Sequence, residues 1–199
     1  MGLLTNLVLL AAAAAGVTAD TADVAAPAVP SITSITYSGT GCTSDPKLTG
    51  GFNDATLSFS AFNTNLPGAT TQTANCQVHL EAKGASPGWQ VALQTTRVRG
   101  HAVLAPGTTL NHYTTVYFSE NAGNTDTIQT SFSNSGDGTV DQLVSLAGSA
   151  GTDKVWSSCT GSDGFTGILN INFRSALVGD GTASFKTNTE EWDLVWRRC

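Results

Sequence analysis

The sequence predicts an all-β protein, a single-domain antiparallel β-sandwich of jelly-roll-like type that is held by two disulfides. Three observations lead to this prediction. Apolar and polar residues alternate with a period of two along most of the chain, turn signals rich in glycine and proline separate these runs, and four cysteines are distributed among them. Many short alternating strands with regular turn signals are typical of sandwiches and jelly rolls.

Residues 1–19 are expected to form a signal peptide rather than part of the sandwich. Leu3 to Ala15 is an apolar run that is too short to span a bilayer but suits the hydrophobic part of a secretory signal. The small residues of Val17-Thr18-Ala19 fit the site that a signal peptidase reads. The expected product is a secreted, extracellular protein that begins at Asp20.

Residues 20–30 are expected to form a linker or pro-segment, because Pro27 and Pro30 flank small residues and no hydrophobic period develops there. The folded domain is expected over residues 31–199. This length is that of one ordinary domain with enough chain to bury a core.

The clearest expected strand is the run 56–62, in which apolar residues point to one side and polar or small residues to the other. Near Thr95-Thr96 the apolar residues change from odd-numbered to even-numbered positions. This change predicts a bulge or a new strand at that point. The same alternation recurs over residues 76–81, 89–93, 110–118, 128–132, 169–174 and 192–197.

Helix is expected to be scarce. Residues 140–147 have a weak helical spacing of apolar residues, but their serine and glycine neighbours limit them to a short turn or less. The turns between the expected strands are marked by Pro67-Gly68, Pro87-Gly88, Pro106-Gly107, residues 135–138 and residues 179–181.

The charge balance excludes two classes of partner. The formal net charge is −6 and the pI is about 4.8, whereas nucleic acid or an anionic membrane would require clustered lysine and arginine. After the leader, no segment of the sequence is long and apolar enough for membrane insertion. The sequence leaves the oligomeric state open.

The four cysteines are Cys42, Cys76, Cys159 and Cys199. An even number in an exported chain indicates two disulfides rather than a metal site, and three pairings are possible. We favour Cys42 with Cys76 and Cys159 with Cys199, because each pair joins neighbouring segments. In the chain-entropy description, each bridge of this kind contributes about 3.5 to 4 kcal/mol to stability.

Several short motifs, most of them around the cysteines, occur together in a fixed order. They are Gly39-Thr40-Gly41-Cys42, Asn75-Cys76, Arg99-Gly100, Tyr117-Phe118-Ser119, Trp156-Ser157-Ser158-Cys159, Leu169-Asn170-Ile171-Asn172 and Trp196-Arg197-Arg198-Cys199. Over nearly the whole mature chain this set resembles the secreted fungal family called domain of unknown function 4360. Ser158 and His101 stand where that family often has proline and an aromatic residue. The resemblance implies an exported, cysteine-bridged β protein and carries no activity with it.

A catalytic interpretation would start from the acidic residues. A polysaccharide hydrolase needs two carboxylates on either side of the glycosidic bond, and the candidates are Glu81 beside His79, or Glu190 and Glu191 with Asp193. Outward-facing side chains on strands are usually just solvated. The sequence lacks the Gly-x-Ser-x-Gly motif of a serine nucleophile, and the cysteines are expected to be bridged. No catalytic residue is therefore assigned.

Metal and cofactor sites are not expected. Scattered histidines more often serve as ordinary surface or core residues than as ligands, and loop aspartates without a complete calcium motif are typical of turns. The residues in question are His79, His101, His112, Asp137, Asp141 and Asp163.

A binding interpretation rests on aromatic and amide side chains. Tyr113 and Tyr117 share the parity opposite to Val116 and Phe118, so they are expected to project from one face of a sheet, and Asn170 and Asn172 form a comparable polar pair. Sugars stack on tyrosine rings while nearby amides hydrogen-bond their hydroxyls. The alternative is that the tyrosines form a second core layer.

Three functions therefore remain open. The leading hypothesis is a non-catalytic extracellular binding or interaction protein whose ligand is a glycan or a cell-surface component. The second is a hydrolase that acts on polysaccharide. The third is a secreted effector directed at another protein, which would use an exposed apolar patch.

Overall fold

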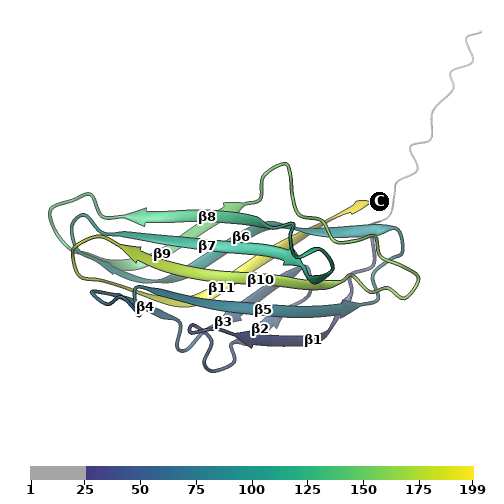
Figure 1. The fold of residues 1–199 in the computed structure, drawn as a ribbon, viewed down its shortest axis with the longest axis horizontal. Coiled ribbons are helices and arrows are strands. Elements are labelled where there is room, and N and C mark those ends of the chain that lie inside the picture. Colours follow the sequence, from purple (N-terminus) through teal and green to yellow (C-terminus); the bar gives the residue numbers. More distant parts are fainter. Residues whose placement is uncertain (1–25) are drawn as a thin grey trace, which may run out of the picture.

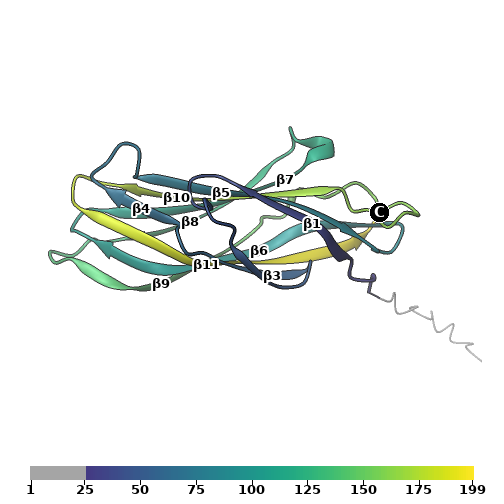
Figure 2. The same cartoon turned by 90° about the horizontal axis from the view of Figure 1, so that it is seen from below.

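Residues 26–199 are the part of the chain that the structure, a computed structural model, describes. The expected signal peptide and most of the expected linker lie outside the described residues. In the described part, eleven strands form two antiparallel sheets that stack face to face (Figure 1, Figure 2). The strands are β1 (Ser31–Ser38), β2 (Lys47–Gly50), β3 (Asp54–Ser58), β4 (Asn63–Leu66), β5 (Thr73–Lys83), β6 (Trp89–Leu104), β7 (Thr109–Phe118), β8 (Asp126–Ser133), β9 (Val140–Ser149), β10 (Ile168–Val178) and β11 (Ala183–Arg198).

The strand order is that of a jelly roll. Sheet A has the order β1-β5-β10-β7-β8, and sheet B has the order β2-β3-β11-β6-β9 with β4 also paired to β11. From β4 onward, successive strands alternate between the sheets except for the β7–β8 pair. Strands β4 to β11 thus form two facing four-stranded units, β5-β10-β7-β8 and β4-β11-β6-β9, and β1, β2 and β3 extend the sheets at their edges. The predicted all-β sandwich is confirmed.

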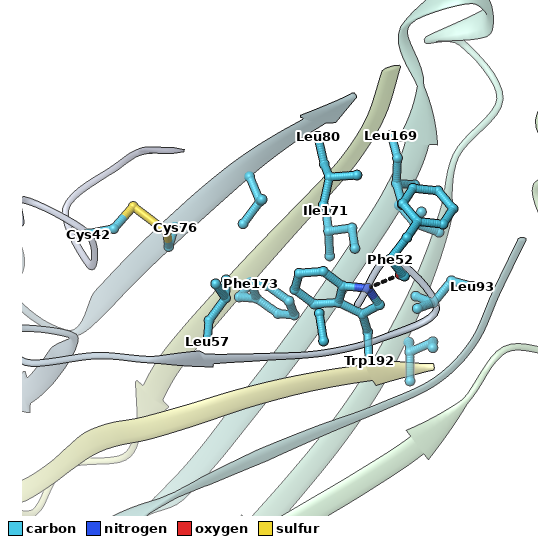
Figure 3. Packing of buried hydrophobic residues seen from close by; sticks show 14 of the residues in the cluster. Cys42, Phe52, Leu57, Cys76, Leu80, Leu93, Leu169, Ile171, Phe173 and Trp192 are labelled. Atoms are coloured by element: carbon cyan, nitrogen blue, oxygen red, sulfur yellow. Dashed lines mark hydrogen bonds between the residues drawn. A yellow bond between two sulfur atoms is a disulfide. The ribbon is translucent and has the colours of Figure 1, made fainter. Parts of the chain in front are cut away.

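The core lies between the sheets and is centred on Trp192. The indole stacks on Phe173 with the ring centroids 6.2 Å apart, and its N–H donates to the Phe52 carbonyl at 3.3 Å. Figure 3 shows these side chains together with leucines from both sheets. Trp192 is 1% exposed, so the one polar atom of its ring is satisfied inside the core.

Bulges reset the inward side of the two longest strands. In β11 Thr187 pairs with Gly100 and Thr189 with Arg99, which leaves Asn188 without a partner in β6. An extra residue in one strand reverses which parity faces the core. The inward residues of β11 therefore change from odd to even numbers, and Trp192 points inward.

A second bulge lies where the sequence predicts one. Thr95 pairs with Asp193 and Leu93 with Leu194, so Gln94 is the extra residue in β6. Val91 and Leu93 face the core before the bulge, and even-numbered residues face it afterwards. The predicted bulge near Thr95-Thr96 is confirmed.

The prediction of at most a short turn over residues 140–147 is wrong. These residues belong to β9, which pairs with β6 from Thr95 to Leu104. Val144 is buried, and Gly148 lies so close to sheet A that a Cβ there would meet Ile128 Cγ2 at 2.4 Å. Pairing with β6 and burial of one face outweigh the weak helical spacing, since strand preference depends on such contacts.

The disulfides join Cys42 to Cys76 and Cys159 to Cys199, which is the favoured pairing. The first ties the segment after β1 to β5 in sheet A, and Figure 3 shows it at the edge of the core. The second ties the segment before β10 to the end of β11. Within residues 26–199, no helix is long and apolar enough to cross a membrane.

Replacement of Trp192 by alanine is expected to lower the free energy of unfolding by about 3–5 kcal/mol, because it removes a large buried ring and leaves a cavity. Chemical denaturation of the oxidised protein measures this change. Leu143→Ala is the control, since Leu143 is 74% exposed and its loss is expected to change stability by less than about 0.5 kcal/mol. Similar losses in both variants would contradict the described core.

Candidate functional site

The outer face of sheet A, the side turned away from sheet B, is mostly polar. It consists of every second residue of four adjacent strands, while the residues between them are inward-facing. Its polar and aromatic members in the central rows are Asn75, Gln77, His79 and Glu81 of β5, Asn170, Asn172 and Arg174 of β10, Asn111, Tyr113, Thr115 and Tyr117 of β7, and Thr127, Gln129 and Ser131 of β8.

The structure brings all four residues of the expected ligand site together on this face. Asn170 lies directly opposite Tyr117, and Tyr113 lies opposite Arg174, across the β7–β10 pair. Asn172 occupies the row between them. Both tyrosines are half-buried on the outer side of the sheet, so they do not form the second core layer that was the alternative.

Tyr113 forms a stacked pair with a cation. The guanidinium carbon of Arg174 lies 4.4 Å from the centroid of the Tyr113 ring, which is the geometry of a cation–π interaction. Arg174 is exposed. One side of the tyrosine ring is therefore covered by a charged group that itself faces solvent.

Asn170 holds the neighbouring loop. Its Nδ2 donates to Ser119 Oγ at 2.8 Å and to the Ile168 carbonyl at 3.0 Å, and its Oδ1 accepts a hydrogen bond from His79 Nδ1. The side chain is buried, with its amide engaged by the protein. Its contribution to a ligand site is therefore to position Ser119 and His79.

The β7–β8 connection forms a wall at this end of the face. It begins with the short 3-10 turn η1 (Ser119–Asn121), and Figure 2 shows it rising away from sheet A on the outer side. Glu120 Oε1 accepts a hydrogen bond from the Ile168 N–H at 3.0 Å. The loop is thus anchored to β10 next to Tyr117.

The Asn172 side chain makes fewer hydrogen bonds within the protein than the Asn170 side chain. Its Nδ2 donates to Gln77 Oε1 at 2.8 Å, and it is only half-buried. The Asn172 carbonyl oxygen and the Gln77 amide N–H groups have no hydrogen bond to Tyr113, Tyr117 or Arg174 among the described residues. Gln77 Nε2 also donates to the Val78 carbonyl at 3.5 Å.

The outer face of sheet B carries two adjoining hollows. Two adjoining hollows of about 440 and 480 Å³ lie along β6, between β9 and β11, and share Glu191 in their lining. Arg99 Nε lies 3.4 Å from Glu191 Oε1, and the Thr95 hydroxyl donates to Asp193 at 2.6 Å. Glu191 and Asp193 are therefore already paired with neighbouring side chains, whereas Asp54, opposite Asp193 across the β3–β11 pair, is exposed.

The expected group of acids near the C-terminal end is divided between two sides of the sheet. Glu191 and Asp193 face outward, but Glu190 is 0% exposed and points between the sheets. Successive residues of a strand point to opposite faces, and the bulge at Asn188 makes the even-numbered residues of β11 the inward ones. Glu190 and Glu191 therefore cannot act on one bound molecule from the same side.

Glu190 instead lies in a buried polar layer with His112 and Ser175. His112 Nε2 is 3.3 Å from Glu190 Oε1, and His112 Nδ1 hydrogen-bonds Ser175 Oγ at 3.1 Å. On each strand this layer lies between the two hydrophobic clusters of the core; on β10, for example, Ser175 lies between Phe173 and Leu177. The order serine, histidine, acid resembles a catalytic triad, but all three side chains are buried and closed to substrate.

Sequence reasoning missed this buried layer, although a signal was present. His112 shares its parity with Leu110 and Phe118, and Glu190 shares its parity with Trp192. A polar residue in the inward register of an alternating strand indicates a buried polar site. That signal was set aside because isolated acids and histidines are usually solvated.

Burial controls the titration of Glu190. Removal from water raises the pKa of the Glu190 carboxyl above its ordinary value of 4.5, and the nearby His112 opposes this rise by its charge and hydrogen bonding. The carboxylate oxygens have no well-directed hydrogen bond from any described residue. Desolvation without such donors favours the protonated acid.

The histidines and loop aspartates do not gather into a metal site. His79 contacts Asn170, His101 contacts Asp141 and His112 lies in the core. In the part of the chain that the structure describes, no three histidine, cysteine or acidic side chains are placed to share a metal ion. Asp163 accepts a hydrogen bond from the Phe165 N–H within its own turn.

The family model "Domain of unknown function (DUF4360)" matches residues 28–199. This chain belongs to that family. It is also 33% identical over 150 residues to an "Uncharacterized secreted protein" of Arthroderma benhamiae. The matched region covers 72% of this chain and 57% of that protein. The chain therefore spans less than two thirds of the length of this relative.

Two solved structures of β-sandwich proteins are similar to the chain at low identity. TmCBM61 in complex with β-1,4-galactotriose is 12% identical, with 85% of this chain and 91% of that chain covered and a TM-score of 0.24. A structure concerned with the promiscuous specificity of carbohydrate-binding modules from the β-sandwich superfamily is 13% identical, with 82% and 57% covered and a TM-score of 0.27. Similarity of this extent assigns no ligand to this chain.

The raised pKa of Glu190 gives stability a defined pH dependence. Between the unfolded-state pKa of about 4.5 and the higher folded-state pKa, only the folded protein holds this proton. The contribution of Glu190 to the free energy of unfolding is therefore expected to be fully present below pH 4.5 and to be lost at up to about 1.4 kcal/mol per pH unit across this interval.

Glu190→Gln is expected to remove this slope, and urea titrations between pH 4 and pH 8 measure it. Glu81→Gln, at an outward-facing residue of β5, is the control and is expected to keep the slope. An unchanged slope in the Glu190 variant would show that the buried carboxyl does not control the pH dependence.

Proposed function

We propose that this protein is a secreted glycan-binding protein and that it binds its ligand on the outer face of sheet A. The observation that carries the proposal is the placement of Tyr113 and Tyr117 on one exposed side of β7, with the amides of Gln77 and Asn172 beside them. Aromatic faces and amide groups in one plane are the chemistry that recognises a sugar ring and its hydroxyls.

The spacing of the tyrosines favours a chain of sugars over a single one. They are four residues apart on the same side of a strand, which places their Cα atoms about 13 Å apart. This span exceeds one sugar ring. The wall formed by the β7–β8 connection limits the face beyond Tyr117, so a bound chain would run from Tyr117 toward Tyr113 and Gln129.

Secretion is part of the same proposal. Residues 1–19 would act as the signal peptide, residues 20–30 as a linker or pro-segment and residues 31–199 as the folded domain. Two disulfides within one domain support an oxidising, extracellular location. A family relative is described as secreted.

The positions of the acidic residues near the tyrosines favour a binding function over hydrolysis. A glycosidase needs two carboxyl groups across one bond. Around the outer face of sheet A the described acids include Glu81 on β5 and Glu120 in the wall, and the Glu120 carboxylate is engaged by the Ile168 N–H. Asn170, Asn172 and Gln77 occupy the central positions instead.

A protein-directed effector finds less support. The large apolar side chains exposed in the described part are Val29, Leu143 and Val178. They lie on three different segments, in the N-terminal coil, β9 and β10. A docking patch for another protein would gather such side chains on one surface.

Tyr113→Ala and Tyr117→Ala are each expected to weaken glycan binding by about tenfold or more, because each removes an aromatic contact with the sugar. An array of polysaccharides and glycans, read for binding and for released reducing sugar in the same wells, measures both properties. Leu143→Ala on the opposite sheet is the control and is expected to bind like the unchanged protein.

The outcomes separate the competing functions. Binding that is lost in the tyrosine variants, without sugar release, supports the proposal. Release of reducing sugar would contradict a purely binding role and direct attention to Glu191 and Asp193. Absence of binding and release across the array would overturn the proposal in favour of a protein partner.

A further inference from the structure

We infer that the outer face of sheet A selects an acidic glycan, and that Arg174 binds the carboxylate of a uronic-acid residue lying against Tyr113. The inference rests on the proposed glycan-binding function and adds the chemical class of the ligand. It is carried by the position of Arg174, whose guanidinium lies among uncharged side chains beside Tyr113 on the candidate ligand face.

Arg174 is a charged side chain among uncharged ones. Its cross-strand neighbours are Asn75 on β5 and Tyr113 on β7. The outward residues before and after it on β10 are Asn172 and Ala176. The nearest rows of the face therefore supply amides, hydroxyls and one aromatic ring, with no carboxylate to neutralise the guanidinium.

The hydrogen-bonding capacity of Arg174 is also unused. None of the ion pairs among residues 26–199 involves it, and none of their side-chain hydrogen bonds comes from it. The contact with the Tyr113 ring uses the flat side of the guanidinium, whereas its five N–H donors point outward in its plane. This fork matches a carboxylate in a two-point contact.

Arginines elsewhere show what an ordinary surface pairing looks like in this protein. Arg99 pairs with Glu191, and Arg197, which stacks on Trp156, also donates to Gln90 at 3.3 Å. A cation–π contact alone therefore does not prevent an arginine from finding a side-chain partner here. Arg174 stacks in the same way but keeps its donors free, as does Arg198 over Trp89. Arg174 differs from Arg198 in lying beside Tyr113 on the candidate ligand face.

The negative net charge of the protein strengthens the argument that Arg174 makes a specific contact with an anion. With a net charge of −6, the protein as a whole repels anions, so an acidic ligand would need a specific contact rather than general attraction. A uronic-acid sugar presents a ring face, hydroxyls and a carboxylate together. Tyr113, the amides of Asn75 and Gln129, and Arg174 are the matching groups in one row of the sheet.

The test compares acidic polysaccharides with their own uncharged forms. Polygalacturonate, polyglucuronate and alginate are each measured against the carboxyl-reduced polymer, which keeps the linkage but loses the charge. The unchanged protein is expected to bind at least one acidic polymer about tenfold more tightly than its reduced form. Added salt is expected to reduce this preference, since it screens an exposed charge pair.

Arg174→Gln is expected to abolish the preference, while Arg174→Lys keeps part of it. Arg97→Gln is the matched control, because Arg97 is also exposed on a central strand but lies on the outer face of sheet B. A preference that survives in Arg174→Gln would overturn the role of this residue.

Two further outcomes are distinguishable. Equal binding of acidic and reduced polymers by the unchanged protein would overturn the inference and leave glycan binding intact, whereas absence of binding to any polysaccharide would overturn the proposed function itself. Poly-glutamate serves as a carboxylate source without sugar rings. Binding of poly-glutamate as tight as that of the best polysaccharide would overturn the assignment to a glycan.

Discussion

The paired strands β6 and β11 form the backbone contact on which both faces of this sandwich depend. They run beside each other for almost their full length at the centre of sheet B, and each carries one extra residue, Gln94 in β6 and Asn188 in β11. Because side chains alternate strictly along a strand, each bulge decides what lies inside for every residue that follows it. The inward position of Trp192 and the outward position of Glu191 both follow from Asn188.

The same bulge explains why the core is divided. Between the hydrophobic cluster around Trp192 and the one around Phe185 lies the polar layer of Glu190, His112 and Ser175. A buried carboxyl with few donors costs stability, yet it also fixes the register of the sheets, since a slip would leave these groups facing apolar neighbours. The resemblance of this layer to a catalytic triad is therefore a consequence of packing. The candidate ligand face lies on the opposite, outer side of sheet A.

Local periodicity made most of this fold readable from the sequence. Strands with clean alternation, such as the one that carries Tyr113 and Tyr117, have the outward face that their parity predicts, because burial of one face is a local property. Strand β9 was missed because its assignment depends on pairing with β6, which no local pattern encodes. Glu190 was missed because acids on strands are usually solvated, although its even number matches that of the core residue Trp192. The free donors of Arg174 depend on which residues of β5 and β7 lie beside it, and sequence alone does not reveal those neighbours.

The position of β10 and β11 also determines the order in which the fold can be completed. Each is the central strand of its sheet, yet each follows nearly all the other strands along the chain. Neither sheet can close around its centre before residues 168–198 have been added, and contacts of such long range form slowly. The bridge between Cys159 and Cys199 joins the segment before β10 to the end of β11, so it ties together the two segments that complete the sheets last.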